Sequence, residues 1–337
     1  MEISRRHGAG GAENGLSEGM HDMEILVTGG LGMIGQPLVR ELRSRGHSVW
    51  VCDLRHDRGP QFVRCDVASH RQLARLVGEH RFDLVYHLAA EFGRWNGEDY
   101  YETMWRSNVI GTRNVIDLQE KHRFRLVFTS SSEVYADFDG VMAEEVMDRH
   151  EIRQLNDYAI SKWVNELQIM NAAKMAGTET VRVRIFNAYG PGEEYHTYRS
   201  VVCRLIYSAL CGLPITVYRD HHRTLVYLSD AVRTLANVAE RFRPGNVYNL
   251  GGTQDHSVKA LSDLILKHTG SIGAHITYKD QEPFTTRNKR VAIDRAVKDL
   301  DHRADITLEE GIPKTIAWMR DAYREDIQAA VRAHPGA

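Results

Sequence analysis

The stretch ILVTGGLGMIG, residues 25–35, decides the fold that this sequence predicts. Its first four residues are apolar or β-branched and predict a buried strand, and the amphipathic run at residues 36–45 predicts a helix. The glycines between them follow a G-x-x-G-x-x-G spacing rather than the plain G-x-G-x-x-G form. Such a turn lets the backbone approach a pyrophosphate closely, and the helix N-terminus offers free N–H groups to the phosphates. We interpret the stretch as a dinucleotide-binding turn, although glycine-rich turns also serve ordinary loops.

A second apolar strand, residues 48–53, supports this interpretation because it ends in Asp53. An acidic residue about 20 positions after the glycine turn accepts hydrogen bonds from the adenosine ribose in dinucleotide-binding folds. The same carboxylate would repel a 2′-phosphate, so we expect NAD(H) rather than NADP(H). Arg55, two residues later, weakens that preference.

Strand-like and helix-like segments alternate from residue 24 to about residue 180. The predicted strands cover residues 25–28, 48–53, 61–64, 84–88, 125–130 and 180–186. The predicted helices between them cover residues 36–45, 70–80, 101–121 and 157–176. This alternation indicates right-handed βαβ crossovers and an α/β fold with a doubly wound parallel sheet. Ligands bind such sheets at the carboxyl ends of the strands.

Polar residues follow two of the predicted strands, where a site is expected. Residues 129–132 are a Thr-Ser-Ser-Ser cluster that could be only a turn, but Glu133 directly after it makes it a candidate site. Tyr158 and Lys162 are four apart and share one helix face. A surface pair is the plain alternative. The order of the elements argues against it: glycine turn, serine-rich strand end, then Y-x-x-x-K.

Composition excludes several classes of function. The 337 residues contain 43 Lys and Arg against 45 Asp and Glu, so no basic excess points to nucleic acid or a membrane surface as a partner. No apolar run reaches the length of a membrane span. The four cysteines form no C-x-x-C pair and are interpreted as reduced core residues of a cytoplasmic protein. The 17 histidines form no metal-binding motif, so we expect no metal.

Taken together, the motifs resemble the extended short-chain dehydrogenase/reductase family, which contains nucleotide-sugar epimerases, dehydratases and decarboxylases. The matching pieces, in the family's order, are TGGLGMIG, Asp53, CDV at 65–67, HLAA at 87–90, NVIGT at 108–112, TSSSEVY at 129–135, YAISK at 158–162 and RIFNAYGPG at 184–192. HRTLVYLSD at 222–230 and YNLGG at 248–252 match more loosely.

The resemblance implies a Rossmann-type domain with a smaller α/β substrate domain, tightly bound NAD, a nucleotide-diphosphate sugar as substrate, and a homodimer. We expect a flexible extension at residues 1–22, the NAD-binding domain at 23–186 with later segments returning to it, and mainly the nucleotide-sugar-binding domain at 187–337. The implied cofactor-binding residues are Gly29, Gly32, Met33, Ile34, Gly35, Asp53, Asp66, Val67, Leu88, Ala89, Ala90, Asn108, Tyr158 and Lys162. The implied substrate-binding residues are Glu91, Arg94, Asn187, Arg199 and Arg223, and the resemblance implies that Arg223 contacts the nucleotide diphosphate.

The implied chemistry begins with oxidation of the sugar at C4. Tyr158 would take the hydroxyl proton, Lys162 and a nicotinamide cation would favour the phenolate, and Ser131 would hydrogen-bond the same oxygen. The next step depends on Ser132 and Glu133, which resemble the pair found in 4,6-dehydratases and uronate decarboxylases. A simple 4-epimerase, which needs no such carboxylate, is the alternative, and a non-catalytic dinucleotide sensor is the alternative class.

For a decarboxylase, the resemblance also implies an arginine of the C-terminal domain near the sugar carboxylate. Lys289 and Arg290 fall near the expected place in the sequence, without a clean match to an arginine.

Overall fold

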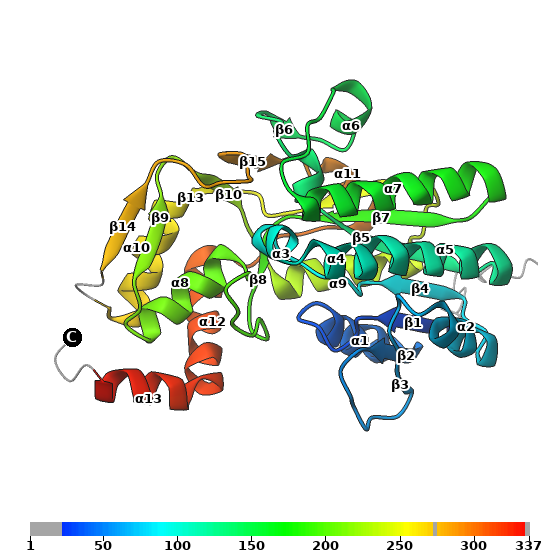
Figure 1. The fold of residues 1–337 in the computed structure, drawn as a ribbon, viewed down its shortest axis with the longest axis horizontal. Helices are drawn as coiled ribbons and strands as arrows, with labels where there is room; N and C mark the ends of the chain where they lie inside the picture. The colour runs from blue at the N-terminus through cyan, green and yellow to red at the C-terminus, as the bar shows by residue number, and fades with distance from the viewer. Residues whose placement is uncertain (1–21, 272–274, 334–337) are drawn as a thin grey trace, which may run out of the picture.

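The computed structural model describes residues 22–271 and 275–333 (Figure 1). The expected flexible extension at residues 1–22 lies outside this part of the chain, apart from its last residue.

A seven-stranded parallel sheet lies at the centre of the molecule, in the order β12-β7-β5-β4-β1-β2-β3. This confirms the predicted α/β fold with its doubly wound sheet. The strands are β1 (Glu24–Thr28), β2 (Ser48–Asp53), β3 (Phe62–Arg64), β4 (Leu84–His87), β5 (Arg125–Ser131), β7 (Thr180–Ile185) and β12 (Val247–Leu250). Six of them were expected in the sheet from their alternation with helices, and β12 joins it from beyond residue 187.

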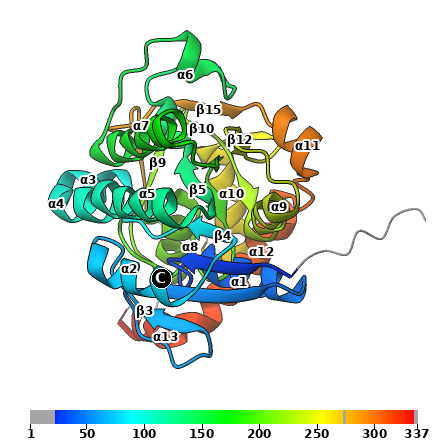
Figure 2. The ribbon, with the colours of Figure 1, turned by 90° about the vertical axis from the view of Figure 1, so that its right-hand side faces the viewer.

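Helices cover both faces of this sheet, as Figure 2 shows. On one face, apolar residues of α1 (Gly35–Ser44), α9 (Leu228–Glu240) and α11 (Asp294–Leu300) join the same core cluster as β1 and β12. The other face carries α2 (His70–Glu79), α5 (Gly111–His122) and α7 (Asp157–Ala176). Buried apolar side chains on both faces of a parallel sheet explain why its strands read as continuous apolar runs.

The single helix predicted at residues 101–121 is interrupted in the structure. It consists of α4 (Tyr101–Met104), the π-helical segment η1 (Trp105–Ile110) and α5. Asn108 in η1 is buried and bonded to neighbouring segments, and such tertiary contacts leave no trace in hydrophobic periodicity.

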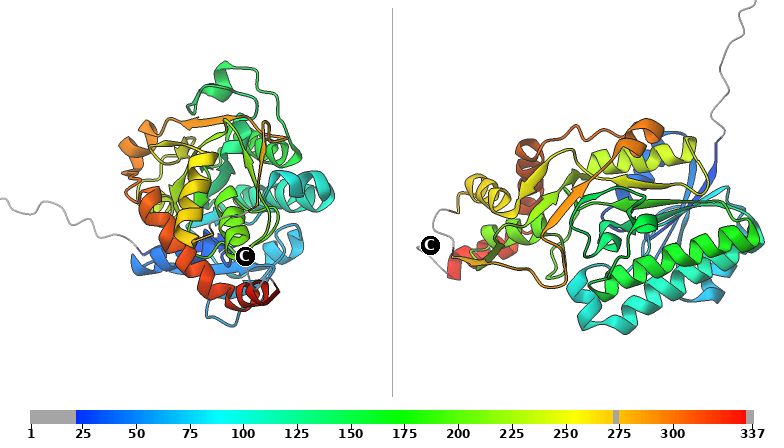
Figure 3. Two further views of the ribbon diagram at one scale, coloured as in Figure 1. Left: turned by 90° about the vertical axis from the view of Figure 1, so that its left-hand side faces the viewer. Right: turned by 90° about the horizontal axis from the view of Figure 1, so that it is seen from above.

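A second group of elements lies beyond the carboxyl ends of the parallel strands, as Figure 3 shows. Its core is built from α8 (Val201–Leu210), β9 (Ile215–Tyr218), α10 (Val258–Thr269), β14 (Ile276–Lys279) and α12 (Leu308–Ala322). Helix α8 starts at Val201, and the Ser200 hydroxyl caps it by accepting from the Cys203 N–H.

Short strands connect this group to the main sheet. A four-stranded sheet has the order β13-β10-β15-β6, and β8 pairs with β11. The successive strands β10 and β11 therefore pair with different partners. The predicted domain division at residue 186 stays a prediction. The bounds are β6 (Val141–Met142), β8 (Ala188–Tyr189), β10 (His222–Thr224), β11 (Val226–Tyr227), β13 (Asp255–Ser257) and β15 (Asn288–Val291). The remaining helical segments are α3 (Arg94–Asp99), η2 (Ser132–Tyr135), α6 (Val146–Arg149) and α13 (Arg324–Ala333).

Candidate active site

A cavity of about 1240 Å³ runs along the carboxyl ends of the parallel strands and under the second group of elements. Ligand sites for one small molecule usually occupy about 300–1,000 Å³, so this cavity has room for two ligands. All the residues expected from the sequence to form the site line it, except Asn108. We call the part around Gly29, Gly35 and Asp53 the glycine end, and the part around Glu133, Glu282 and Lys289 the charged end.

At the glycine end, the backbone packs too closely for side chains. Gly29 has φ +68°, and a Cβ there would lie 2.7 Å from the Ala89 nitrogen. A Cβ on Gly35 would lie 2.4 Å from the Gly29 oxygen. Gly35 also begins α1, whose first turn contains no acidic residue and whose N-terminus receives no side-chain cap within the described residues. The turn therefore presents backbone N–H groups to the cavity, as an anion site at a helix N-terminus requires.

Asp53 stands at the end of β2 and braces the glycine turn. Its Oδ2 accepts from the Leu31 N–H at 3.1 Å, and its Oδ1 accepts from the Arg55 N–H at 3.0 Å. The Arg55 guanidinium lies 3.7 Å from the same carboxylate and its side chain is 49% exposed. Arg55 therefore offsets part of the negative charge that Asp53 presents to a ribose.

Asn108 lies behind the cavity wall, which differs from the expected contact with a cofactor. Its side-chain oxygen accepts from the Glu91 N–H at 2.8 Å, and its Nδ2 donates to the Glu91 carbonyl and to the Ser161 hydroxyl. Asn108 thus ties the loop after β4 to α7. The motif predicted its importance, but its burial depends on a π-helical turn that the motif does not reveal.

Tyr158, Ser131 and Lys162 come together between the two ends of the cavity. Burial raises the pKa of Tyr158 to about 12, and the charge of the nearby Glu133 carboxylate contributes to this rise. A hydrogen bond from Ser131 acts in the opposite direction and lowers the pKa. The Lys162 ammonium donates to the Thr129 carbonyl at 2.9 Å, and burial lowers its pKa to about 8. The Tyr158 hydroxyl therefore keeps its proton in the free protein, and the phenolate requires a further positive charge nearby.

The helix that carries Tyr158 and Lys162 is fixed by a buried ion pair. Glu166 on α7 accepts from the Ser130 hydroxyl at 2.6 Å and from Arg184 Nε at 2.9 Å. Because Ser130 is on β5 and Arg184 is on β7, Glu166 anchors α7 to two strands at once. The relative placement of Ser131 and Tyr158 depends on this anchor.

Glu133 and Lys289 form an ion pair at the charged end. Lys289 on β15 donates to Glu133 Oε1, and its side chain is 3% exposed. Burial would raise the pKa of Glu133, but the charges of Lys289, Arg94 and Arg223 hold it below its usual value. Burial lowers the pKa of Lys289 to about 8 despite its carboxylate partner.

The structure decides between the two cations considered from the sequence. Lys289 lines the cavity, whereas the Arg290 side chain is 57% exposed and contacts Asp255 at 3.4 Å. Neighbouring residues on a strand point to opposite faces, so only one of the two can reach the cavity.

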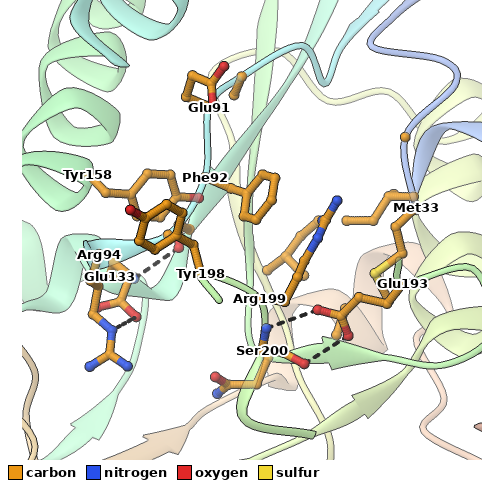
Figure 4. A pocket seen from close by; sticks show the side chains of 18 of the residues that line it. Met33, Glu91, Phe92, Arg94, Glu133, Tyr158, Glu193, Tyr198, Arg199 and Ser200 are labelled. Atoms are coloured by element: carbon orange, nitrogen blue, oxygen red, sulfur yellow. Dashed lines mark hydrogen bonds and ion pairs between the residues drawn. The ribbon is translucent and has the colours of Figure 1, made fainter. Parts of the chain in front are cut away.

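Arginines from separate elements complete the charged end, and Figure 4 shows Arg94 beside Glu133 and Tyr158. Arg94 Nη2 lies 2.8 Å from Glu282 Oε1, and its Nε lies 3.9 Å from Glu133. Arg223 Nη2 donates to Glu282 at 3.1 Å, while its Nη1 donates to the carbonyls of His222 and Arg287, each at 2.8 Å.

The other predicted substrate residues line the cavity from separate segments. The Arg199 guanidinium lies 3.9 Å from the centroid of the Phe92 ring. Asn187 has φ +38° and donates to the Thr224 carbonyl at 3.0 Å, which fixes the start of the loop after β7. The Glu91 carboxylate accepts from Asn96 at 3.1 Å.

Three lining residues were missed by the sequence interpretation. Glu193 accepts from the Ser200 N–H and hydroxyl and anchors the loop before α8, as Figure 4 shows. At the charged end, Arg204 Nη2 lies 3.8 Å from Glu282 Oε1. None of them belongs to a recognised motif. Glu193 and Glu282 are buried in loops, where a charged residue is normally solvated, so local pattern did not predict their burial. Arg204 lies on α8, and local pattern did not reveal that it faces Glu282.

Comparison with known proteins identifies the chain. Residues 25–251 match the profile of the NAD dependent epimerase/dehydratase family. The chain belongs to this family. The UDP-N-acetyl-alpha-D-glucosaminuronate decarboxylase of Bacillus cytotoxicus is 29% identical over 319 residues, covering 88% of this chain and 97% of the relative. The dTDP-glucose 4,6-dehydratase 1 of Escherichia coli is 26% identical over 338 residues, covering 88% of this chain and 92% of the relative.

A solved structure of MoeE5 in complex with UDP-glucuronic acid and NAD is also similar to this member of the epimerase/dehydratase family. It has a TM-score of 0.80 at 30% identity, covering 89% of this chain and 99% of MoeE5. The chain is accordingly an NAD-dependent enzyme, as the glycine turn predicted. The glycine end fits this cofactor, because its backbone leaves no room for side chains and Asp53 lines the cavity at the end of β2, where dinucleotide-binding folds carry an acidic residue.

No helix in the described part of the epimerase/dehydratase family member is long and apolar enough to cross a membrane.

Proposed function

We propose that this enzyme decarboxylates a nucleotide-linked hexuronic acid through a 4-keto sugar. The observation that carries the proposal is the buried Lys289 ammonium, which lies at Glu133 in the same cavity as Tyr158 and Ser131. A carboxylate at sugar C6 would find a cation there, close to the residues that act on C4. The nucleotide, the hexose and the residue roles below are parts of this proposal.

The chain's own residues would act as follows. NAD, when bound, supplies the group that accepts the C4 hydride and later returns it. Tyr158 takes the proton of the C4 hydroxyl, and Ser131 donates to the oxygen that becomes a carbonyl. Lys289 holds the sugar carboxylate. The bond between C5 and C6 then breaks, carbon dioxide leaves, and the electron pair moves onto the C4 oxygen, where Ser131 and Tyr158 stabilise it. Water then supplies a proton at C5 as the C4 carbonyl re-forms. When the hydride returns to C4, Tyr158 gives its proton back to the C4 oxygen.

Decarboxylation fits the charged end better than dehydration does. Elimination of the C6 hydroxyl needs both a base for the C5 proton and an acid for the leaving oxygen. Ser132 is a poor acid. Burial would raise the pKa of Glu133, but its cationic neighbours outweigh burial and hold the pKa low, so Glu133 is a poor acid as well. Decarboxylation of a 4-keto uronate needs neither group. The similarity to the Bacillus cytotoxicus decarboxylase supports this choice.

A 4,6-dehydratase is the second candidate, because the Glu133 carboxylate lies in the cavity with Tyr158 and the Escherichia coli dehydratase is a relative. In that case Glu133→Gln should leave C4 oxidation intact, seen as NADH absorbance on adding substrate. It should slow elimination by about 10²–10⁴-fold, the contribution of one general base.

A panel of nucleotide sugars with mass spectrometry of the products tests the proposal. UDP-, dTDP-, GDP- and CDP-linked hexoses and hexuronates would each be incubated with the purified enzyme, with Tyr158→Phe as the inactive control. Loss of the mass of carbon dioxide from a hexuronate is the expected result. Loss of water from a hexose supports the dehydratase, and an unchanged mass with an altered C4 configuration supports an epimerase. No turnover with any of them would favour the non-catalytic sensor.

We also infer a homodimer formed through α4, η1, α5 and α7. Exposed apolar side chains on these segments support it, namely Tyr101, Ile110 and Leu167, which are 56%, 52% and 46% exposed. A monomeric mass in sedimentation at micromolar concentration would contradict it.

A cytoplasmic location remains part of the proposal, supported by four cysteines that are all free and buried.

A further inference from the structure

Glu282 is a buried carboxylate surrounded by arginines from three different elements. It lies in the segment between β14 and β15. Its Oε1 is 2.8 Å from Arg94 Nη2 and 3.8 Å from Arg204 Nη2, and its Oε2 is 3.1 Å from Arg223 Nη2. Arg94 comes from α3, Arg204 from α8 and Arg223 from β10. One side chain therefore joins three walls of the cavity.

Two of these arginines retain buried donors that nothing in the described part of the chain accepts. They are Arg94 Nη1 and Arg204 Nε. A buried N–H without a partner is unfavourable, and such groups in a cavity indicate a ligand that accepts from them. Each of the two arginines thus gives one nitrogen to Glu282 and keeps another for a ligand.

The charge of the cluster indicates which ligand group it accepts. Glu133 and Lys289 neutralise each other beside it, whereas Glu282 neutralises only one of the three arginines. Two positive charges remain, and the diphosphate of a nucleotide sugar carries two negative charges. Guanidinium groups bind phosphate oxygens through paired N–H donors.

Contacts on both sides hold Glu282 in place. Its N–H donates to His221 Nε2 at 3.2 Å, and His221 Nδ1 donates to the Arg219 carbonyl at 2.8 Å. Two residues later, the Phe284 carbonyl accepts from Asn156 at 3.0 Å. A segment fixed in this way positions its partners rather than moving aside for a ligand.

We propose that Glu282 is a positioning residue that organises Arg94, Arg204 and Arg223 into a cradle for the ligand's diphosphate. This inference rests on the proposed function only in taking the ligand to be a nucleotide sugar. The competing arrangement is a plug, in which Glu282 occupies the anion position and the ligand must displace it. The two arrangements predict opposite signs for the same measurement.

Glu282→Gln removes the charge and keeps the shape of the side chain. Calorimetric titration of the NAD-loaded enzyme would measure the affinity for UDP, dTDP and inorganic pyrophosphate. The cradle predicts binding weakened by about 10-fold or more for the probes that the parent binds, the loss expected for one charged hydrogen bond. Asp280→Asn is the matched control, because it removes a charge from the same segment at a side chain that is 85% exposed. Tighter or unchanged binding by Glu282→Gln overturns the proposal, as does a parent enzyme that binds none of the probes.

A second variant separates a positioning role from general support of the fold. Arg204→Lys keeps the positive charge but lacks the unpartnered Nε donor, so it should weaken UDP binding several-fold while uridine binding, which involves no phosphate, stays the same. Glu282→Asp should restore part of the affinity lost in Glu282→Gln.

Equal losses of affinity for UDP-glucose and UDP-glucuronate in Glu282→Gln support a diphosphate site. A loss confined to UDP-glucuronate would mean that the cradle holds the sugar carboxylate, and would overturn the proposal. Product mass plays no part in these titrations, so the proposed reaction can fail independently.

Discussion

At the glycine end of the cavity, the contact that braces the turn joins residues close in the sequence, because Asp53 accepts from Leu31 only 22 positions away. At the charged end, Lys289 pairs with Glu133 across 156 positions and Arg94 pairs with Glu282 across 188. The glycine end works mainly through backbone groups and the absence of side chains. The charged end works through buried side chains whose charges must balance. The first can be recognised from a motif, whereas the second exists only after folding.

The largest loss of turnover is expected for a change at Tyr158, which lies between the glycine end and the charged end. Tyr158→Phe removes the hydroxyl that takes the C4 proton, so turnover should fall by about 10²–10⁴-fold or more. NADH absorbance on adding substrate should disappear as well, because Tyr158 acts in C4 oxidation, which comes before decarboxylation. Affinities for NAD and for nucleotide diphosphate should stay near those of the parent, since neither end is altered. Retained NADH formation would mean that another residue is the base.

The next effect tests the charged end. Lys289→Gln leaves the Glu133 carboxylate without its main partner and removes the cation proposed for the sugar carboxylate. With a nucleotide hexuronate, kcat/KM should fall by about 10–100-fold, which corresponds to losing one hydrogen bond to a charged group. Arg290→Gln is the matched control, because its side chain is 57% exposed on the same strand. Equal losses in both variants would remove Lys289 from the site.

Lys289 also makes the preference for a glucuronate ligand depend on pH, and the direction of that dependence can be predicted. Burial lowers the pKa of Lys289 to about 8, so its ammonium is complete below that pH and is lost as pH rises through it. The preference for a nucleotide glucuronate over the matching glucose form should therefore decline above about pH 8. The ratio of the two affinities cancels the titration of Lys162, which acts on both ligands. Lys289→Arg should keep the preference at higher pH, and a flat ratio in the parent would contradict the assignment.

The difference between the two ends also explains what the sequence could predict. The turn at residues 25–35, the acidic end of β2 and the Tyr158–Lys162 spacing are local patterns, so the sheet and the glycine end followed from them. The sequence named Glu133 through its place after a serine-rich strand end, and Arg94 and Arg223 through family resemblance. It did not reveal the charged residues that pair with them. Arg204 and Glu282 lie in segments without a motif, and they meet only because folding brings α8 beside the segment between β14 and β15.

A smaller effect tests the glycine end. Gly35→Ala places a Cβ 2.4 Å from the Gly29 oxygen, a contact with backbone that cannot move without opening the turn. We expect a stability loss of about 1–3 kcal/mol, as for overpacking, and about tenfold weaker NAD binding. Gly78→Ala in α2 is the control, since its Cβ would meet nothing within 4 Å. That variant should gain about 0.5–1 kcal/mol from helix propensity, measured by chemical denaturation. A neutral Gly35→Ala would show that the turn is looser than its contacts indicate.

The smallest effect concerns the ion pair at the glycine end. Arg55 lies 3.7 Å from Asp53, and its side chain is 49% exposed, so solvent screens the pair. Exposed pairs contribute about 0–1 kcal/mol, and Arg55→Ala should therefore raise the preference for NAD over NADP by no more than about fivefold. The direction follows from charge, because removing the guanidinium leaves Asp53 more repulsive to a 2′-phosphate. Titration of both cofactors measures the ratio, and Arg58→Ala, in the same loop, serves as the control. If Arg55→Ala changed the ratio as strongly as Lys289→Gln changes kcat/KM, burial would not be what distinguishes the two ion pairs.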